Sequence, residues 1–280
     1  MSSALQKYYR AEKLFITLPS GQDWYKNGEV TFTNSGEIGV KAMTSRDEMM
    51  FKNPDMLLNG ESLIRVIRSC VPGINEPEKL LSNDIDAIIV AIRHATFGKT
   101  MDVVRECPNC KSENTYGVDL DGVLGEITRM DPDYTIDLES GITLHIRPLR
   151  LSESFGVLES QFKQQKILNL LDDNEEMSDE EKGKAFQKEF EKMVDLKGKI
   201  ITDSVYRITH AQDGLDITNK QDIQEFLDNT ERAVIEEIDR TLKRISKIGI
   251  KSEFSLVCEK CNHEWDSDID FNPVTFFTKS

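Results

Sequence analysis

The sequence contains no apolar run that approaches the 18 residues needed to cross a membrane. Its first residues, Met1 to Glu12, are polar and lack the apolar segment of a signal peptide. Basic residues are also scarce: 35 lysines and arginines stand against 50 acidic residues, which gives a formal net charge of -15. We therefore expect no membrane span, a reducing cytosol, and a surface that repels nucleic-acid phosphates.

Motifs for common enzyme classes are missing as well. The chain has no glycine-rich phosphate loop, and His94, His145 and His210 lie in no recognisable nucleophile motif. The acidic run 172–181 lacks both the alternating Asp/Asn pattern and the central glycine of a calcium loop. The sequence therefore predicts a protein that is not an enzyme.

Short strands and helices alternate in the first half of the chain. Residues 14–18 and 30–33 are typical of strands and end at turn residues. Apolar residues at helical spacing predict one helix through Leu63 and Cys70 and a second from Ile85 to Gly98. Further on, Glu139-Ser140-Gly141 separates two strand-like segments and predicts a β-hairpin.

From residue 152 the apolar spacing becomes helical. One stripe falls between residues 151 and 168, and another includes Phe186, Phe190 and Met193. A third is formed by Val234, Ile238, Leu242, Ile245 and Ile248, and Gly249 ends it. Its narrow width predicts packing of one helix on another, with the helix of Phe186, Phe190 and Met193 as the expected neighbour.

The predicted fold class is α+β, with a β-containing frame interrupted by a helical insertion. We expect an N-terminal part of the frame at residues 1–151 and an inserted α-helical module at 152–250. A C-terminal part at 251–280 contributes the strand from Phe254 to Val257 and completes the frame.

Four of the five cysteines form two C-x-x-C pairs, Cys107 with Cys110 and Cys258 with Cys261. Zn²⁺ binds four thiolates at tetrahedral corners, and each C-x-x-C turn supplies two of them. Each pair ends one β-like segment and begins another, and Asn262 suits the left-handed position such turns need. The sequence predicts one structural zinc site, zinc-ribbon-like in form, that joins the two ends of the chain.

Other interpretations of these cysteines are four reduced, buried thiols without a metal, disulfides, or a redox pair. His263 lies two residues after Cys261 and is an alternative ligand, although a partly exposed side chain that supports the turn fits it better. Cys70 is expected in the core of its helix. A shell of four thiolates leaves no open position for water or substrate, so catalysis at the metal is not expected.

A zinc-ribbon-like site also suggests a regulator that binds nucleic acid or the transcription machinery. The residues around both pairs argue against that alternative, because Arg105 and Lys111 are outnumbered by nearby acidic residues. After Cys261 the chain has four acidic residues and no lysine or arginine before Lys279. A surface that gripped phosphate would be basic here.

The sequence resembles the baseplate hub proteins of T4-like contractile-tailed phages, a family called T4 base plate proteins. The matching segments are Phe15–Gly21, Val40–Met50, Leu63–Cys70, Leu81–Asp86, Arg105–Cys110, His145–Leu149 and Cys258 through Phe277. The resemblance covers roughly the first 150 residues and the last 30, and it leaves the helical insertion without a family signature.

The resemblance implies a non-enzymatic structural or assembly component of the baseplate hub. Its partners would be other baseplate and tail proteins, and its location the virion tail, assembled in the host cytoplasm. The long amphipathic helices and the closed cysteine site agree with such a role, which depends on protein–protein contact.

Overall fold

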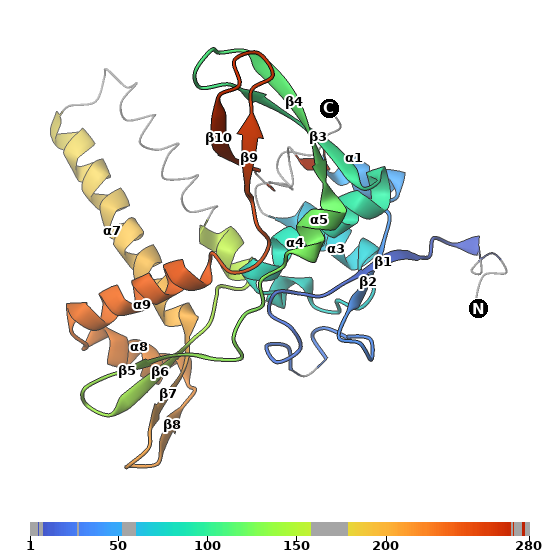
Figure 1. Ribbon diagram of the computed structural model, residues 1–280. Coiled ribbons are helices and arrows are strands. Elements are labelled where there is room, and N and C mark those ends of the chain that lie inside the picture. The colour runs from blue at the N-terminus through green and yellow to red at the C-terminus, as the bar shows by residue number, and fades with distance from the viewer. Residues whose placement is uncertain are drawn as a thin grey trace. The chain divides into compact units, whose positions relative to one another are not determined.

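The chain folds into two compact units, and the second is inserted into the first. Unit 1 consists of residues Met1–Met130 and Ile248–Ser280, and unit 2 of Asp131–Lys247. The structure, a computed structural model, describes residues 5, 8–26, 28–51, 60–157, 179–269, 271 and 276–277 (Figure 1). The sequence had predicted one frame and one insertion, with boundaries at 151/152 and 250/251.

Unit 1 combines three antiparallel two-stranded sheets with a group of helices. The first sheet pairs β1 (Glu12–Ile16) with β2 (Ile38–Lys41), the second β3 (Thr100–Glu106) with β4 (Glu113–Asp119), and the third β9 (Glu253–Val257) with β10 (Glu264–Asp268). The labelled helices in its described residues are α1 (Ser45–Met50), α3 (Glu61–Cys70), the 3-10 helix η2 (Pro77–Lys79), α4 (Ser82–Phe97) and α5 (Leu120–Gly125).

The core of unit 1 centres on α3 and α4. On α3 the apolar face predicted from spacing, Leu63, Val66, Ile67 and Cys70, is buried. Helix α4 is buried on almost every side along its middle, which is typical of a central core helix. Gly98 ends it with φ 101°, a conformation that glycine adopts without strain. The predicted strand at 30–33 is wrong: Val30 makes only an isolated bridge to Ile74, and β2 pairs with β1 instead.

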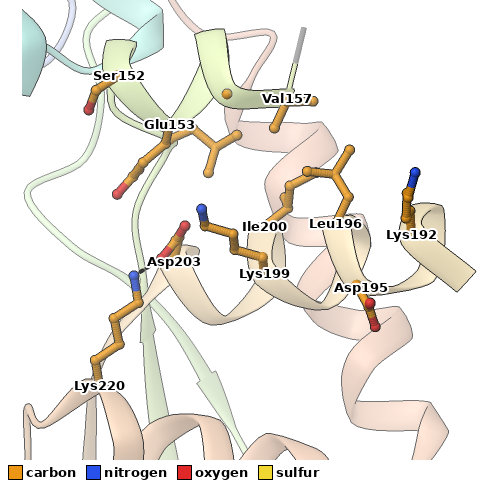
Figure 2. Close-up of a pocket in the computed structure, with 12 residues that line it drawn as sticks. Ser152, Glu153, Val157, Lys192, Asp195, Leu196, Lys199, Ile200, Asp203 and Lys220 are labelled. Atoms are coloured by element: carbon orange, nitrogen blue, oxygen red, sulfur yellow. Dashed lines mark hydrogen bonds and ion pairs between the residues drawn. The ribbon is translucent and has the colours of Figure 1, made fainter. Parts of the chain in front are cut away.

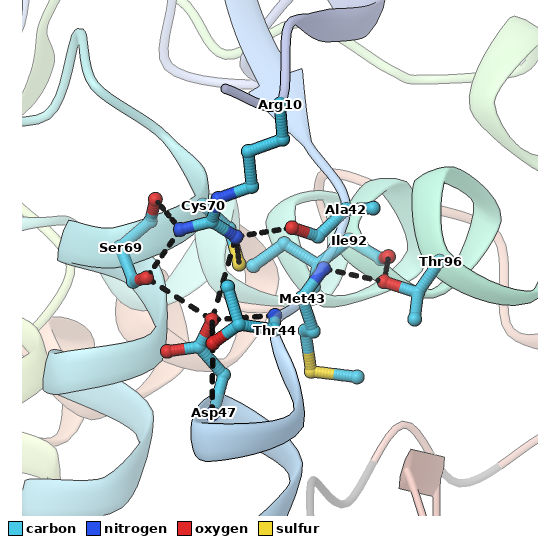
Figure 3. Close-up of polar contacts among 9 residues, drawn as sticks. All are labelled: Arg10, Ala42, Met43, Thr44, Asp47, Ser69, Cys70, Ile92 and Thr96. Atoms are coloured by element: carbon cyan, nitrogen blue, oxygen red, sulfur yellow. Dashed lines mark hydrogen bonds and ion pairs between the residues drawn. The ribbon is translucent and has the colours of Figure 1, made fainter. Parts of the chain in front are cut away.

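Arg10 ties the segment before β1 to three other elements (Figure 3). Its guanidinium donates to the carbonyl of Ala42, to the carbonyl and hydroxyl of Ser69 at 2.7 and 2.5 Å, and to Asp47 at 3.4 Å. Asp47 is also the partner of Thr44 in a capping box that begins α1. The Cys70 thiol lies 3.7 Å from Arg10, and burial raises its pKa to about 11. Cys70 is therefore an uncharged core residue, as predicted.

The N-terminus of α4 holds the loop that follows β1. Asp84 is fully buried and accepts hydrogen bonds from the Ser20 backbone at 2.9 Å, the Ser20 hydroxyl at 2.6 Å and the Tyr25 hydroxyl. Tyr25 in turn accepts from the Leu81 backbone at 2.9 Å. Burial raises the pKa of Asp84 to about 6, although the hydrogen bonds from Ser20 and Tyr25 favour the charged carboxylate.

The points where the chain leaves and re-enters unit 1 lie beside this loop. Thr128 donates to the carbonyl of Gly249 at 2.9 Å, and Met130 donates to that of Pro19 at 2.8 Å. Asn83 donates through its side chain to the carbonyl of Ile248 at 2.6 Å. A side chain at Gly249, whose φ is 139°, would press on the Asn83 backbone. Both ends of the insertion are thus fixed close together.

Unit 2 consists of a four-stranded antiparallel sheet and three described helices. The strands are β5 (Tyr134–Asp137), β6 (Ile142–Ile146), β7 (Val205–His210) and β8 (Leu215–Ile217), paired in that order. The helices are α7 (Asp179–Ser204), α8 (Lys220–Asp228) and α9 (Arg232–Ile245), and residues 151–157 are also helical.

The hairpin predicted at residues 139–141 is confirmed as β5–β6, but it belongs to unit 2 because β6 pairs with β7. The α-helical module predicted at 152–250 also contains the strands β7 and β8, which the sequence did not predict. Residues 205–210 show no burial at strand spacing, because only Val205 and Ile208 are buried, and the short segment lies between helical patterns. The stripe predicted beyond Val157 lies outside the described residues.

Helix α9 turns a narrow apolar face toward α7 and β6. Ile238 and Ile245 are completely buried, whereas Val234 and Leu242 are half-buried. On α7, Phe190 is 53% exposed and therefore lies outside the core, and the side chains of Phe186 and Met193 lie outside the described residues. The predicted packing of one helix on the other is present, without the expected contribution from Phe190.

Replacing Asp84 with asparagine should change how stability depends on pH. A carboxyl whose folded-state pKa of about 6 exceeds its unfolded value of about 3.9 binds more protons in the folded state between these limits. Its contribution to the free energy of unfolding therefore falls as the pH rises, by about 2–3 kcal/mol in all. Relative to the wild type, Asp84→Asn should gain stability from pH 4 to 6 and stay level above pH 6.

Urea unfolding at a series of pH values measures this difference. Asp102→Asn is the control, because Asp102 is exposed on β3 and should give a flat difference. A flat difference for Asp84→Asn as well, or one that falls as the pH rises, would contradict this account of Asp84.

Replacing Ile238 with alanine should destabilise the protein by about 2–5 kcal/mol, because it removes a fully buried side chain and leaves a cavity. Val194→Ala, at a position of α7 that is 54% exposed, should cost less than about 0.5 kcal/mol. Chemical denaturation of both variants tests the difference. Unchanged stability of Ile238→Ala would mean that the stripe on α9 serves to dock another subunit.

Candidate metal centre

The two C-x-x-C pairs lie at the tips of two hairpins of unit 1. Cys107 and Cys110 occupy the turn between β3 and β4, and Cys258 and Cys261 the turn between β9 and β10; Figure 1 shows the two hairpins side by side. The Sγ atoms of Cys107 and Cys261 are 3.7 Å apart, and those of Cys110 and Cys258 are 3.6 Å apart. All four sulfur atoms lie within 4.8 Å of one another.

Both turns have the same backbone hydrogen bonds. The N–H groups of Cys107 and Cys258 donate to the carbonyls five residues later, Ser112 and His263, each at 2.9 Å. Lys111 and Asn262 follow the second cysteine of each pair and adopt positive φ angles of 59° and 54°. The left-handed conformation expected for Asn262 is confirmed. Lys111 was not foreseen, because lysine carries no preference for that conformation.

The positions of the sulfur atoms fit a tetrahedral ion. A Zn–S bond of about 2.3 Å implies about 3.8 Å between neighbouring sulfurs, close to the two separations observed. Cys107 and Cys258 are buried, and Cys110 and Cys261 are partly exposed. Four such donors match the soft ligand set that selects zinc or iron, and they leave no position open for substrate.

The thiols perturb one another strongly. A hydrogen bond from the Ser112 hydroxyl lowers the pKa of Cys258 to about 5. The backbone hydrogen bond from His263 acts to lower the pKa of Cys261. Desolvation and the hydrogen bonds to Cys110 and Cys258 outweigh this effect and raise the pKa to about 11. Four sulfurs this close cannot all carry a negative charge unless a cation lies between them. The donor set is therefore suited to a metal ion.

Polar side chains of the first hairpin contact the sulfurs of the second. Asn114 Nδ2 lies 3.6 Å from Cys258 Sγ, and Asn109 Nδ2 lies 3.6 Å from Cys261 Sγ. The Ser112 hydroxyl lies 3.0 Å from Cys110 Sγ and 3.4 Å from Cys258 Sγ. Sequence analysis missed these residues, because a hydrogen bond to a sulfur 144 or more positions away leaves no local pattern.

The hairpins also pack on each other below the cysteines. The Tyr116 hydroxyl donates to the carbonyl of Val257 at 2.9 Å, and its ring meets that of Trp265 edge-on. Arg105 donates to Ser267 at 3.2 Å and to the carbonyl of Asp268 at 3.0 Å. The His263 ring is exposed and stacks on Trp265. Among the described residues His263 is not part of the metal-ligand cluster, which consists of the four cysteines.

Comparison with known proteins was made at three levels. The family model for the T4 bacteriophage base plate protein matches residues 17–278, nearly the whole chain. The chain belongs to this family. No curated protein and no solved structure matches it. The match also runs through the insertion, which the sequence analysis had left without a family signature.

Membership of this family indicates a component of the phage baseplate that interacts with other tail proteins. The structure adds a four-cysteine cluster able to hold a metal ion. None of the helices in the described part of the chain is both long enough and apolar enough to cross a bilayer.

The outer faces of the two cysteine hairpins are acidic. Their exposed carboxylates are Asp102, Glu106, Glu113 and Asp119 on β3 and β4, and Glu253, Glu264, Asp266 and Asp268 on β9 and β10. Lys111, 3.5 Å from Glu106, is an exposed basic residue beside them. The acidic character of these faces agrees with the excess of acidic residues around both cysteine pairs in the sequence.

Three of the four histidines have side-chain hydrogen-bond partners among the described residues. His145 Nδ1 lies 2.8 Å from Asp133, and its Nε2 lies 3.1 Å from the Thr209 hydroxyl. The chain of contacts from Asp133 through His145 to Thr209 resembles the catalytic triad of a hydrolase. None of these three residues lines either of the described pockets. His94 pairs with Asp121 at 2.7 Å, and His210 lies 3.2 Å from the carbonyl of Ser140.

Unit 2 has a groove of about 510 Å³ between α7 and residues 149–157 (Figure 2). Its apolar floor includes Val157, Leu196 and Ile200. Lys220 at its edge pairs with the buried Asp203, and Lys199 extends between Asp203 and Glu153. The groove is therefore of mixed charge, and no hydrogen-bonded pair of nucleophile and base is found among the described residues that line it.

Proposed function

We propose that the protein is a non-enzymatic structural or assembly component of the baseplate hub of a contractile-tailed phage. In this proposal Cys107, Cys110, Cys258 and Cys261 bind one structural Zn²⁺. The observation that carries it is the family match over residues 17–278 together with four sulfurs at near-tetrahedral separations. Bound zinc would close the shell and fix the two hairpins, while the residues around it supply the surface for other baseplate subunits.

The acidic hairpin faces favour this role over that of a zinc-ribbon regulator. A regulator that contacts nucleic acid needs positive charge at the surface that meets phosphate, and these faces carry eight exposed carboxylates. Partners would be other baseplate and tail proteins, met in the host cytoplasm during assembly. The protein would contribute contacts rather than chemistry.

One Zn²⁺ per chain should copurify with the protein, and Cys107→Ser and Cys258→Ser should each lose it. Binding of the metal is coupled to folding of the two hairpins, so both variants should also melt at a lower temperature than the wild type. Elemental analysis and thermal melts measure the two effects. Cys70→Ala is the control and should keep its zinc, because Cys70 is buried on α3, contacts Arg10 and is not part of the four-cysteine cluster. Wild-type protein that is folded and free of metal would contradict the zinc proposal.

In a phage that lacks this gene, a plasmid copy of the wild type or of Cys70→Ala should restore complete baseplates, and Cys258→Ser should not. Electron microscopy and plaque counts report the outcome, and mass spectrometry of purified particles shows whether the chain stays in the virion.

The purified protein should also pass through a DNA column at low salt. Salt-dependent retention on DNA, together with normal tails in the phage lacking the gene, would overturn the baseplate role and favour the regulator.

A further inference from the structure

Asn114 is a buried polar residue at the boundary between the two cysteine hairpins. It lies on β4 opposite Arg105 of β3, at an inward position of the strand, and only 6% of it is exposed. Burying an amide without hydrogen bonds costs about 1–3 kcal/mol. The hydrogen-bond partners of the buried Asn114 side chain therefore indicate what this residue does.

Those groups belong to both hairpins. Nδ2 donates to the carbonyl of Ser112 at 3.0 Å within the first turn, and it lies 3.6 Å from Cys258 Sγ in the second. Oδ1 accepts from the backbone N–H of Glu259 at 3.1 Å. One side chain thus holds the start of the second C-x-x-C turn by its sulfur and by the next peptide.

Asn109 offers an internal comparison. It is exposed, and its amide reaches only Cys261 Sγ, at 3.6 Å, among the groups of the second hairpin. Removing one exposed contact of this kind leaves the cysteine turn with its own backbone hydrogen bonds, which run from Asn262 to Cys258 and from Cys258 to His263. Removing the Asn114 amide would instead take away two contacts with the start of this turn, and would leave only the Ser112 contact to Cys258 and the Tyr116 hydrogen bond to Val257 beside it.

We propose that Asn114 is the positioning residue of the metal site: it holds Cys258 in place for the ion and donates an N–H···S bond to the metal-bound thiolate. This inference rests on the proposed metal site and specifies how the chain prepares it. Residues that hydrogen-bond to metal ligands fix the ligands' orientation and moderate their charge, and their loss typically weakens metal affinity by about 10–100-fold.

Asn114→Asp separates the two functions of the amide. Aspartate keeps the size of the side chain and the acceptor for Glu259, but it presents an oxygen in place of the donor toward Cys258. Asn114→Ala removes both functions, and Asn109→Ala is the matched control. We expect Asn114→Asp to weaken Zn²⁺ binding by about 10–100-fold, Asn114→Ala by a similar factor, and Asn109→Ala by less than about threefold.

Competition with a chromogenic chelator measures the Zn²⁺ affinity of each full-length protein. Substitution with Co²⁺ gives a second readout, because the sulfur-to-cobalt absorption band responds to the donation at Cys258 and not to general stability. We expect this band to shift in both Asn114 variants and to match the wild type in Asn109→Ala.

The outcomes separate this inference from the proposed function. Wild-type protein that binds neither metal would overturn the metal site itself. Tight metal binding by the wild type, with unchanged affinity and an unchanged cobalt spectrum in Asn114→Asp, would overturn only the role of Asn114. If Asn114→Ala fails to fold, Asn114→Asp still decides between these results.

Discussion

Four sulfurs at the tips of two hairpins can share one ion only if the chain between the hairpins leaves and returns at neighbouring points. Cys258 follows Cys110 by 148 positions, and most of the intervening chain forms unit 2. The hydrogen bond between Thr128 and Gly249 and the contacts to Pro19 and Asn83 hold the two connections together. Geometry at the base of the insertion thus makes the cysteine cluster possible.

The cysteine cluster stabilises two hairpins that have little hydrophobic core of their own. The buried apolar residues of unit 1 gather around α3 and α4, whereas β3–β4 and β9–β10 are two-stranded sheets with one face exposed and acidic. Isolated two-stranded sheets are marginally stable in water. Packing of Tyr116 on Trp265, the hydrogen bonds of Asn114 and, as we propose, a metal ion together compensate for the missing core. The acidic surface of the two hairpins agrees with the proposed role of a subunit that works by contact.

Sequence patterns foresaw those features that depend on local spacing. The helix of Leu63 and Cys70, the hairpin at Gly141 and the left-handed Asn262 all follow from residue preferences within one element. Features that depend on contacts between residues far apart in the sequence were harder to predict. The role of Asp84 was not predicted: α4 begins after Leu81 without a side-chain cap, and Asp84 accepts hydrogen bonds from Ser20 and Tyr25. Strand β7 was hidden between helical patterns, and Asn114 gave no signal because its partners lie in another hairpin.

X-ray absorption at the zinc edge tests the central claim most directly, because it reports the atoms bound to the metal in the intact protein. A site made of Cys107, Cys110, Cys258 and Cys261 predicts four sulfur neighbours at about 2.3 Å and no nitrogen or oxygen in the first shell. A first shell with a nitrogen at about 2.0 Å would indicate a histidine ligand. Protein purified without reductant that holds no zinc, and that has a disulfide within each pair, would show that the site binds no metal. Either result would contradict the proposal that four thiolates join the two hairpins.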